Sequence, residues 1–275
     1  MTPGARVSAV IEILDNYLVK KSDTRLVNKW FRNNRFAGSK DKQVIRDLVY
    51  KCLRYKLSFY WPFKQAGLLL SGRTIVLGML KISNHCFKEI FDGKQYSPKD
   101  LTDSEKIVLS NFDKSLDSAP AFVKFNFPEF LENSLKESFG HSFEKNLSAL
   151  SNRADLFIRL NCIKANIGVV VNSLKDDGIV VERIPNCKNS LKVIGNKSKF
   201  NRSMAYLSGQ VEIQDIHSQL AVEFIDPKKN TKVLDFCAGA GGKTLAIGSI
   251  TRGNAEYFVY DKSKTKLPNL KARCQ

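Results

Sequence analysis

Histidine and paired cysteines are scarce in this sequence, and their scarcity excludes several kinds of site. The 275 residues include three histidines and six cysteines, and no two cysteines form a Cys-x-x-Cys pair. The spacing that zinc sites and disulfide frameworks require is absent, so we predict no metal site and reduced thiols. No run reaches the roughly 18 consecutive apolar residues of a membrane span. The amphipathic start is interrupted by Glu12 and Asp15, so we expect a cytoplasmic protein without a membrane partner.

Acidic residues are also few relative to basic ones. The chain has 27 Asp and Glu against 44 Lys and Arg, which gives a net charge of +17. Such a field favours a polyanionic partner, either nucleic acid or an anionic membrane surface, and charge alone does not choose between them. The remaining composition, 43% hydrophobic and 26% charged, is typical of a folded chain of about two domains.

The periodicity of apolar residues changes twice along the chain. Residues 1–127 predict a helical domain, in which Thr102 and Glu105 have the spacing of a capping box. A further helix is expected from Pro128 to Gly140, followed by β-branched runs at 155–164 and 178–185 that flank a helical stretch. We therefore expect a second segment, 128–204, to be a helix plus a small α/β module, and a third segment to cover residues 205–275.

The third segment contains a strand, a glycine-rich loop and a helix. Residues 233–236 form an apolar run, the glycines 239, 241 and 242 predict a tight turn, and residues 243–250 are helical in pattern. A backbone without Cβ atoms lets a ligand approach closely, and the helix start offers free N–H groups. A second strand ends at Asp261, 22 residues after Gly239. That spacing is close to the ~20 residues at which an acidic side chain meets a ribose.

Three ligands compete for such a loop, and a plain βα turn without a ligand is a fourth reading. A Walker loop needs glycine where Cys237 stands, and the dinucleotide pattern Gly-x-Gly-x-x-Gly needs glycine where Thr244 stands. Both phosphate-binding patterns therefore fail. A nucleoside ligand without a pyrophosphate remains, for which S-adenosylmethionine is the common case, and the acidic strand end favours it over the plain turn.

The motifs of this segment resemble one family. Residues 237–244, Cys-Ala-Gly-Ala-Gly-Gly-Lys-Thr, are similar to the Asp-x-Cys-Ala-Ala-Pro-Gly-Gly-Lys-Thr motif of Sun/RsmB/NOP-type RNA cytosine-C5 methyltransferases, with Ala240 in the place of proline. Gly209 and the run Gln214-Asp215-x-x-Ser218-Gln219 resemble the family's Gly…Gln-Asp-x-x-Ser-Gln segment. The run Arg159-x-Asn161-x-x-Lys164 resembles its Arg-x-Asn-x-x-Lys strand.

The resemblance implies a fold and a set of site residues. The fold is multi-domain, α plus α/β, with an N-terminal helical NusB-like domain that is expected to bind RNA, a small RRM-like α/β module, and the first part of a Rossmann-like class I methyltransferase domain. It implies that Asp261 accepts the ribose hydroxyls and that Asp235 holds the loop near the methionine amino group. The implied S-adenosylmethionine-binding residues are Cys237, Ala238, Gly239, Ala240, Gly241, Gly242, Lys243, Asp235 and Asp261, and the implied RNA contacts are Arg159, Asn161 and Lys164.

The family's chemistry also needs a cysteine thiolate, and no residue here is assigned that role. The resemblance places the catalytic cysteines in later motifs, so the nucleophile is expected beyond Gln275 and the methyltransferase domain is expected to be incomplete. We therefore expect the opening portion of an enzyme that forms 5-methylcytosine in RNA, in particular ribosomal RNA, with a second chain as a candidate to complete the sheet. The rival hypothesis is a non-catalytic RNA-binding protein that carries a remnant of that domain.

Overall fold

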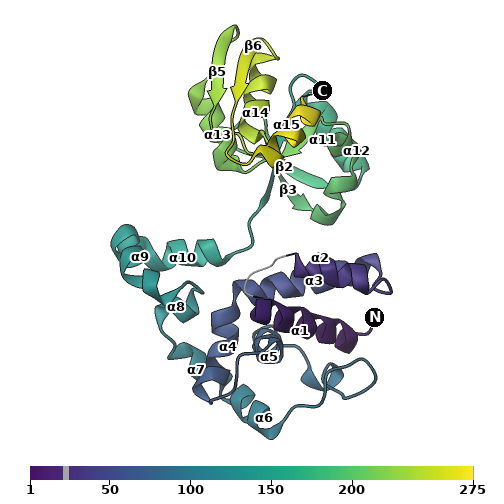
Figure 1. Ribbon diagram of the computed structural model, residues 1–275, viewed down its shortest axis with the longest axis vertical. Coiled ribbons are helices and arrows are strands. Elements are labelled where there is room, and N and C mark those ends of the chain that lie inside the picture. Colours follow the sequence, from purple (N-terminus) through teal and green to yellow (C-terminus); the bar gives the residue numbers. More distant parts are fainter. Residues whose placement is uncertain (21–24, 275) are drawn as a thin grey trace. The chain divides into compact units, whose positions relative to one another are not determined.

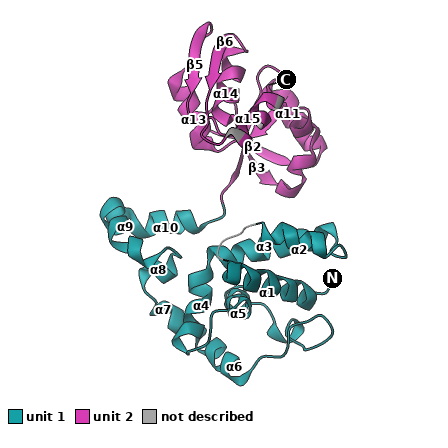
Figure 2. Ribbon diagram, in the orientation of Figure 1, with its two compact units in different colours: residues 1–153 teal, residues 154–275 magenta. Residues whose placement is uncertain are grey.

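A computed structural model describes residues 1–20 and 25–274, and the contacts divide the chain after residue 153 (Figures 1 and 2). Unit 1 is helical and unit 2 contains both sheets. Among the described residues no helix is long and apolar enough to cross a membrane. The combination of helical and α/β elements agrees with the predicted α plus α/β class, while the NusB-like assignment of the helical domain stays a prediction.

Unit 1 contains ten α-helices in its described part. They are α1 (Pro3–Lys20), α2 (Leu26–Asn33), α3 (Ser39–Arg54), α4 (Lys56–Gln65), α5 (Gly72–Ile82), α6 (Asp103–Ser110), α7 (Phe112–Asp117), α8 (Ala121–Lys124), α9 (Glu132–Phe139) and α10 (Phe143–Ser151). The main core of unit 1 lies where α1, α3, α4 and α5 pack together. Gly78 permits the contact between α4 and α5, because a Cβ there would lie 2.1 Å from the carbonyl oxygen of Phe59.

Residues 128–153 lie in unit 1 and not with the α/β module that follows them. Phe143 and Leu147 of α10 form a small core with Phe127. Phe122 and Phe125 of the preceding segment pack against it. The α9 helix ends before Gly140, which has a φ of +48°, in agreement with the stop predicted from the sequence.

Unit 2 combines an antiparallel sheet with a short parallel one. Its elements are β1 (Leu156–Leu160), α11 (Ile167–Asp176), β2 (Val180–Arg183), β3 (Ser190–Gly195), α12 (Met204–Leu207), β4 (Val211–Ile213), α13 (Ile216–Ile225), β5 (Thr231–Asp235), α14 (Gly242–Thr251), β6 (Ala255–Val259) and α15 (Leu267–Arg273). The four-stranded sheet has the order β2-β3-β1-β4, so β1 and β2 run in the same direction with β3 between them. The β5 and β6 strands pair in parallel.

The parallel pair is covered on one side only. The side chains Val222, Ala246 and Ile247 form a small core to which Val233 and Tyr257 add. Apolar side chains elsewhere on the pair remain open to solvent: Leu234 is 66% exposed and Phe258 is 48% exposed. Parallel strands are ordinarily buried on both faces, so this pair contributes little stability by itself.

The isolated segment 205–275 is expected to lack a cooperative thermal unfolding transition, because its core consists of a few side chains around α14. Circular dichroism against temperature, with residues 154–275 as the control, measures this. A sigmoidal transition with a flat folded baseline in the shorter segment would show the expectation to be wrong.

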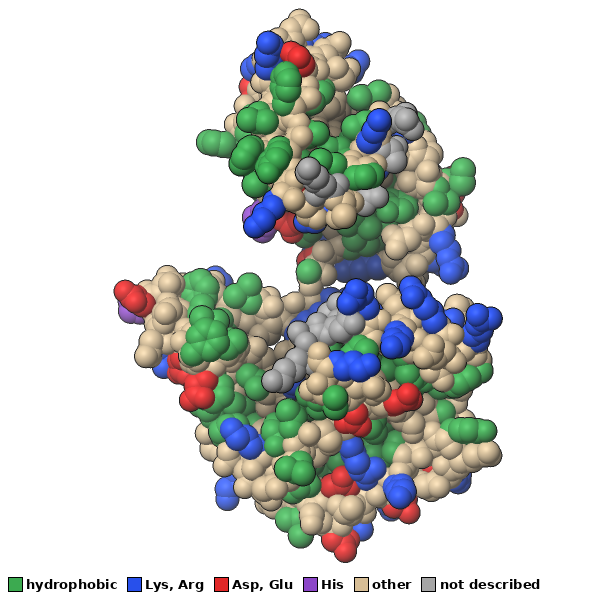
Figure 3. Space-filling model, viewed as in Figure 1, with side chains coloured by type: hydrophobic (Ala, Val, Ile, Leu, Met, Phe, Trp, Pro, Cys, Tyr) green, Lys and Arg blue, Asp and Glu red, His purple; other side chains and the backbone are tan. Residues whose placement is uncertain are grey.

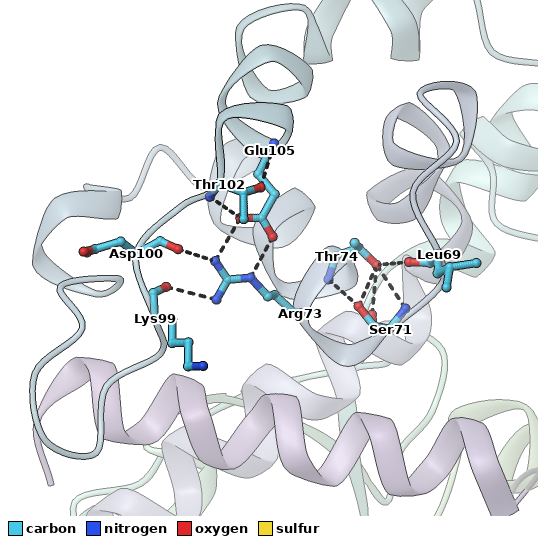
Figure 4. Close-up of polar contacts among 8 residues, drawn as sticks. All are labelled: Leu69, Ser71, Arg73, Thr74, Lys99, Asp100, Thr102 and Glu105. Atoms are coloured by element: carbon cyan, nitrogen blue, oxygen red, sulfur yellow. Dashed lines mark hydrogen bonds and ion pairs between the residues drawn. The ribbon is translucent and has the colours of Figure 1, made fainter.

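A buried ion pair fixes the start of α6 in unit 1. The Glu105 carboxylate accepts hydrogen bonds from Arg73 Nε at 2.7 Å and Nη2 at 2.9 Å, and from the Thr102 amide at 2.9 Å (Figure 4). The last contact completes the predicted capping box. Burial favours the neutral acid, but the hydrogen bonds of Arg73 and Thr102 outweigh it and hold the pKa of Glu105 below its usual value. Arg73 also donates to the carbonyl oxygens of Lys99 and Asp100.

Replacing Arg73 by Ala is expected to lower the free energy of unfolding by about 3 kcal/mol, because it leaves the Glu105 carboxylate buried without its partner. Because the folded-state pKa of Glu105 is depressed, its stabilisation is present above the ordinary value of 4.5 and is lost as the pH falls below it. Urea denaturation across pH 3 to 7, roughly the range of that titration, should show a larger loss of stability towards low pH in the wild type than in Glu105→Gln, because other carboxylates with lowered pKa values contribute in both. Lys106→Gln, which removes an exposed ion pair of the same helix, serves as the control and should unfold as the wild type does.

Candidate functional site

The predicted glycine loop and Asp261 lie together at one edge of the parallel pair. Because β5 and β6 run in the same direction, their carboxyl ends meet at that edge. Asp261 Oδ2 accepts a hydrogen bond from the Gly239 amide at 2.7 Å, and Oδ1 accepts one from the Ser263 amide at 2.8 Å. These two bonds, that of Ser263 first, hold the pKa of Asp261 below its usual value. The carboxylate therefore stays ionised and can accept further hydrogen bonds.

Two glycines of the loop occupy positions that other residues fill poorly. Gly239 has a φ of +56° and Gly241 a φ of +84°, in the left-handed region that favours glycine. A Cβ on Gly239 would lie 4.0 Å from Asp261 Oδ2, in the space beside that carboxylate. A Cβ on Gly241 would lie 2.1 Å from Leu270 Cδ1 of α15. The absence of a side chain at Gly241 thus lets Leu270 pack against the loop, and its absence at Gly239 leaves a space beside Asp261.

Asp235 connects the end of β5 to the first turn of α14. Its Oδ2 accepts a hydrogen bond from Thr244 Oγ1 at 2.7 Å, and Thr244 is buried. The Asp235 carbonyl oxygen accepts from the Tyr260 amide at 2.9 Å. The sequence predicts that Asp235 holds the loop but identifies no partner for it. The structure shows that the partner is Thr244, the threonine of the Gly-Gly-Lys-Thr run.

The other loop residues differ in exposure. Ala238 is buried, and its amide donates to the Tyr260 carbonyl oxygen at 2.9 Å. Cys237 and Lys243 are exposed, and Gly242 is half-buried. Sequence analysis missed a pair of rings beside the loop: Phe236 and Tyr260 stack with centroids 4.9 Å apart. Both rings are largely open to solvent.

The Arg-x-Asn-x-x-Lys run meets the Gly…Gln-Asp segment through direct hydrogen bonds. Arg159 donates from Nε to Gln214 Oε1 at 2.7 Å, Asn161 from Nδ2 to the Gly209 carbonyl oxygen at 3.2 Å, and Lys164 from Nζ to the Ser208 carbonyl oxygen at 3.3 Å. The two motifs, about fifty residues apart in the chain, therefore form one side of unit 2.

Arg159 is buried, unlike the other two residues predicted to contact RNA. It is 6% exposed, and its Nη2 lies 3.3 Å from Glu212 Oε2. Burial lowers the pKa of the guanidinium, and the Glu212 carboxylate opposes that shift. Lys164 is exposed and Asn161 half-buried, so these two side chains are the accessible members of the motif.

Arg273 of α15 links this side of unit 2 to the glycine loop. Its guanidinium donates from Nη1 to the carbonyl oxygen of Ala240 at 2.6 Å and from Nε to Glu212 Oε1 at 3.1 Å. Glu212 thus lies between Arg159 and Arg273. Sequence analysis assigned no role to Arg273, since nothing in the local sequence indicates that it folds back onto the loop.

An open cleft of about 1640 Å³ lies between the antiparallel sheet and the α14–α15 part of unit 2. Its wall includes Asn161, Lys164, Glu212, Ala240, Thr244 and Lys271. The accessible residues of the Arg-x-Asn-x-x-Lys run therefore share a cleft with the glycine loop. Within the described part of the chain, no group of three metal-binding side chains accompanies it.

No family model matches the chain. The probable ribosomal RNA small subunit methyltransferase B of Synechocystis is 21% identical over 74% of this chain and 43% of its own length. That of Bacillus subtilis is 29% identical over 42% of this chain and 25% of its own. The chain thus spans less than half the length of these curated relatives.

Two solved structures share the fold. The structure titled PH0851 matches 99% of this chain and 66% of its own, with a TM-score of 0.70 and 19% identity. A methyltransferase homologue from Pyrococcus horikoshii matches 55% of this chain and 50% of its own, with a TM-score of 0.51 and 19% identity. The relatives confirm the resemblance drawn from the motifs: this chain is similar to the Sun/RsmB-type ribosomal RNA methyltransferases.

Proposed function

We propose that this chain supplies the cofactor-binding part of an S-adenosylmethionine-dependent RNA methyltransferase that forms 5-methylcytosine, with ribosomal RNA as its substrate. The observation that carries the proposal is the contact between Gly239 and Asp261 at the carboxyl ends of two parallel strands. The names of the curated relatives support ribosomal RNA as the substrate. The choice of carbon 5 of cytosine rests on the motif resemblance.

The residues at this edge fit the nucleoside part of the cofactor. An ionised carboxylate is a suitable acceptor for two ribose hydroxyls, and Asp261 keeps acceptor capacity on both oxygens after its two amide contacts. The space that a side chain at Gly239 would fill is next to that carboxylate. When bound, S-adenosylmethionine supplies an electrophilic methyl group.

The protein's own contribution at this edge is to bind and to orient. Asp261 receives the ribose, and the loop from Cys237 to Lys243 runs along the methionine and ribose parts. Asp235, steadied by Thr244 through one oxygen, offers the other oxygen to the methionine ammonium group. Arg273 restrains the loop by donating a hydrogen bond to the Ala240 carbonyl oxygen.

The cleft beside the loop is the proposed entry for RNA. Asn161 and Lys164 line it, and their amide and ammonium groups suit the sugar-phosphate backbone. Arg159 is already bonded to Gln214 and Glu212, so we assign it a positioning role between the two motifs. The residues proposed to bind the cofactor and those proposed to bind RNA thereby lie next to the same glycine loop.

Asp261→Ala is expected to weaken S-adenosylmethionine binding by about 10- to 100-fold, because it removes charge-assisted hydrogen bonds to the ribose. Isothermal titration calorimetry with the full chain measures the affinity. Asp261→Asn keeps one acceptor oxygen, which can serve one of the two loop amides, and removes the charge with less loss of loop contacts than Ala; it should also bind weakly. Asp226→Asn, an exposed acid after α13, is the control. Unchanged affinity in both Asp261 variants would contradict the assignment, and RNA binding without any cofactor affinity would favour a non-catalytic RNA-binding protein.

Lys164→Gln is expected to weaken RNA binding and to make it less dependent on salt. One lost phosphate contact lowers the slope of log Kd against log salt concentration by about 0.7 for a single strand. Fluorescence anisotropy with a labelled single-stranded RNA measures the slope, and Lys175→Gln, an exposed lysine of α11, removes the same charge elsewhere in unit 2. Equal slopes for the two variants would exclude a phosphate contact at Lys164.

A further inference from the structure

Glu212 of β4 is shared by two arginines that come from different parts of unit 2. Arg159 of β1 donates to its carboxylate from Nη2 at 3.3 Å. Arg273 of α15 donates from Nε at 3.1 Å and also from Nη2. The two contacts of Arg273 make a fork on the carboxylate, which is the strong geometry for an arginine and an acid. One negative charge is therefore set between two positive ones.

The fork leaves the remaining nitrogen of Arg273 directed at the glycine loop. Arg273 Nη1 donates to the Ala240 carbonyl oxygen at 2.6 Å. Leu270, three residues earlier in α15, occupies the space that a side chain on Gly241 would need. The α15 helix thus contacts two consecutive residues of the loop. Because Glu212 holds the Arg273 guanidinium in place, Glu212 controls the contact with Ala240 without touching the loop itself.

The cleft beside the loop concentrates positive charge. Its described lining residues include four cations, Arg159, Lys164, Lys271 and Arg273, and a single carboxylate, that of Glu212. On the face of unit 2 that Figure 3 shows, by contrast, Lys and Arg side chains are scattered among hydrophobic and acidic ones. A polyanion is therefore drawn to the cleft more strongly than to that face.

An anion in the cleft relieves a repulsion between the two arginines. Burial lowers the pKa of Arg159, the Glu212 carboxylate raises it, and the charge of Arg273 lowers it again. The two guanidiniums therefore act on each other across the carboxylate that they share. A phosphate beside Arg273 compensates the excess positive charge, and so it favours the arrangement in which Arg273 holds the loop.

Arg273 can receive such a phosphate without giving up its present contacts. Its hydrogen bonds to Glu212 and Ala240 use one N–H group on each of its nitrogens, and a guanidinium has more N–H groups than these. Its side chain is 34% exposed, so the remaining groups are accessible from the cleft.

We propose that Glu212 is a positioning residue that, through Arg273, couples an RNA phosphate in the cleft to S-adenosylmethionine binding at the glycine loop. The phosphate favours the arrangement that holds the loop, and a loop that is already held binds the cofactor more tightly. Each ligand therefore strengthens the binding of the other, by the same factor in both directions. This inference rests on the proposed function and adds to it a coupling between its two ligands.

The test is calorimetry of S-adenosylmethionine with the full chain, alone and saturated with an oligouridylate of about 12 nucleotides, which is within the range of single-strand sites. This RNA contains no cytosine, so binding is measured without methyl transfer. RNA is expected to tighten cofactor binding by about fivefold or more, as coupled sites usually do. Fluorescence anisotropy of the labelled RNA, with and without cofactor, should give the same factor.

Two variants test the route through Arg273. Arg273→Lys keeps the charge but has one compact ammonium group in place of the fork, so it cannot hold the Glu212 carboxylate and the Ala240 carbonyl oxygen together. It should lose the coupling, while the salt dependence of RNA binding stays as in the wild type. Glu212→Gln should lose the coupling as well. Because it deprives the buried Arg159 of its carboxylate, urea denaturation checks its folding, and Arg273→Lys decides if it is unfolded.

Lys271→Gln is the matched control, because it removes an exposed charge of the same helix and the same cleft. It should weaken RNA binding and keep the coupling factor. Cofactor binding that RNA leaves unchanged or weakens in the wild type would overturn the coupling and leave the cofactor site standing. Coupling kept in Arg273→Lys, or lost equally in Lys271→Gln, would overturn the route through Arg273. No cofactor binding by the wild type, with or without RNA, would contradict the proposed function and the coupling with it.

Discussion

The need to pair a buried guanidinium organises unit 2. Arg159 is withdrawn from water, and an unpaired charge there would cost several kcal/mol. Its partners, Gln214 and Glu212, come from β4 and the segment after it, so satisfying Arg159 fixes that segment against β1. Glu212 also accepts a hydrogen bond from Arg273, and Arg273 in turn donates to the Ala240 carbonyl oxygen of the glycine loop. One chain of polar contacts thus connects the antiparallel sheet to the proposed cofactor site.

Strand direction decides where the chemistry can occur. Parallel pairing of β5 and β6 places Asp235 and Asp261 at the same edge, whereas the antiparallel sheet has no comparable edge. The glycine loop needs only local sequence to adopt its turn, but its function depends on the strand that returns beside it. The residues proposed to contact RNA are positioned relative to this edge as well, because hydrogen bonds join their motif to the segment that precedes β5.

Sequence reasoning succeeded where the information is local. Three features depend on neighbours within a few residues, and the structure shows all three: the glycine turn of the loop, the capping box of α6 and the helix stop at Gly140. A fourth, the position of Asp261 beside the loop, follows from the spacing of one strand, helix and strand, and the structure shows it as well. Pairing over long distances could not be predicted. Arg159 looks like a surface base until Glu212, 53 residues later, is placed beside it. The same holds for Arg73 and Glu105, which are 32 residues apart. Cofactor identity, the target carbon and the catalytic cysteine stay predictions.

The bond between Arg273 and the Ala240 carbonyl oxygen has an evolutionary consequence. Proline, which the resembled motif carries at this position, restricts the backbone through its own ring. This chain has alanine there and obtains a similar restraint from a side chain 33 residues away. Two positions that are distant in sequence are therefore not free to drift independently. Among related sequences, an arginine at the α15 position should accompany alanine in the loop and become dispensable wherever proline is present.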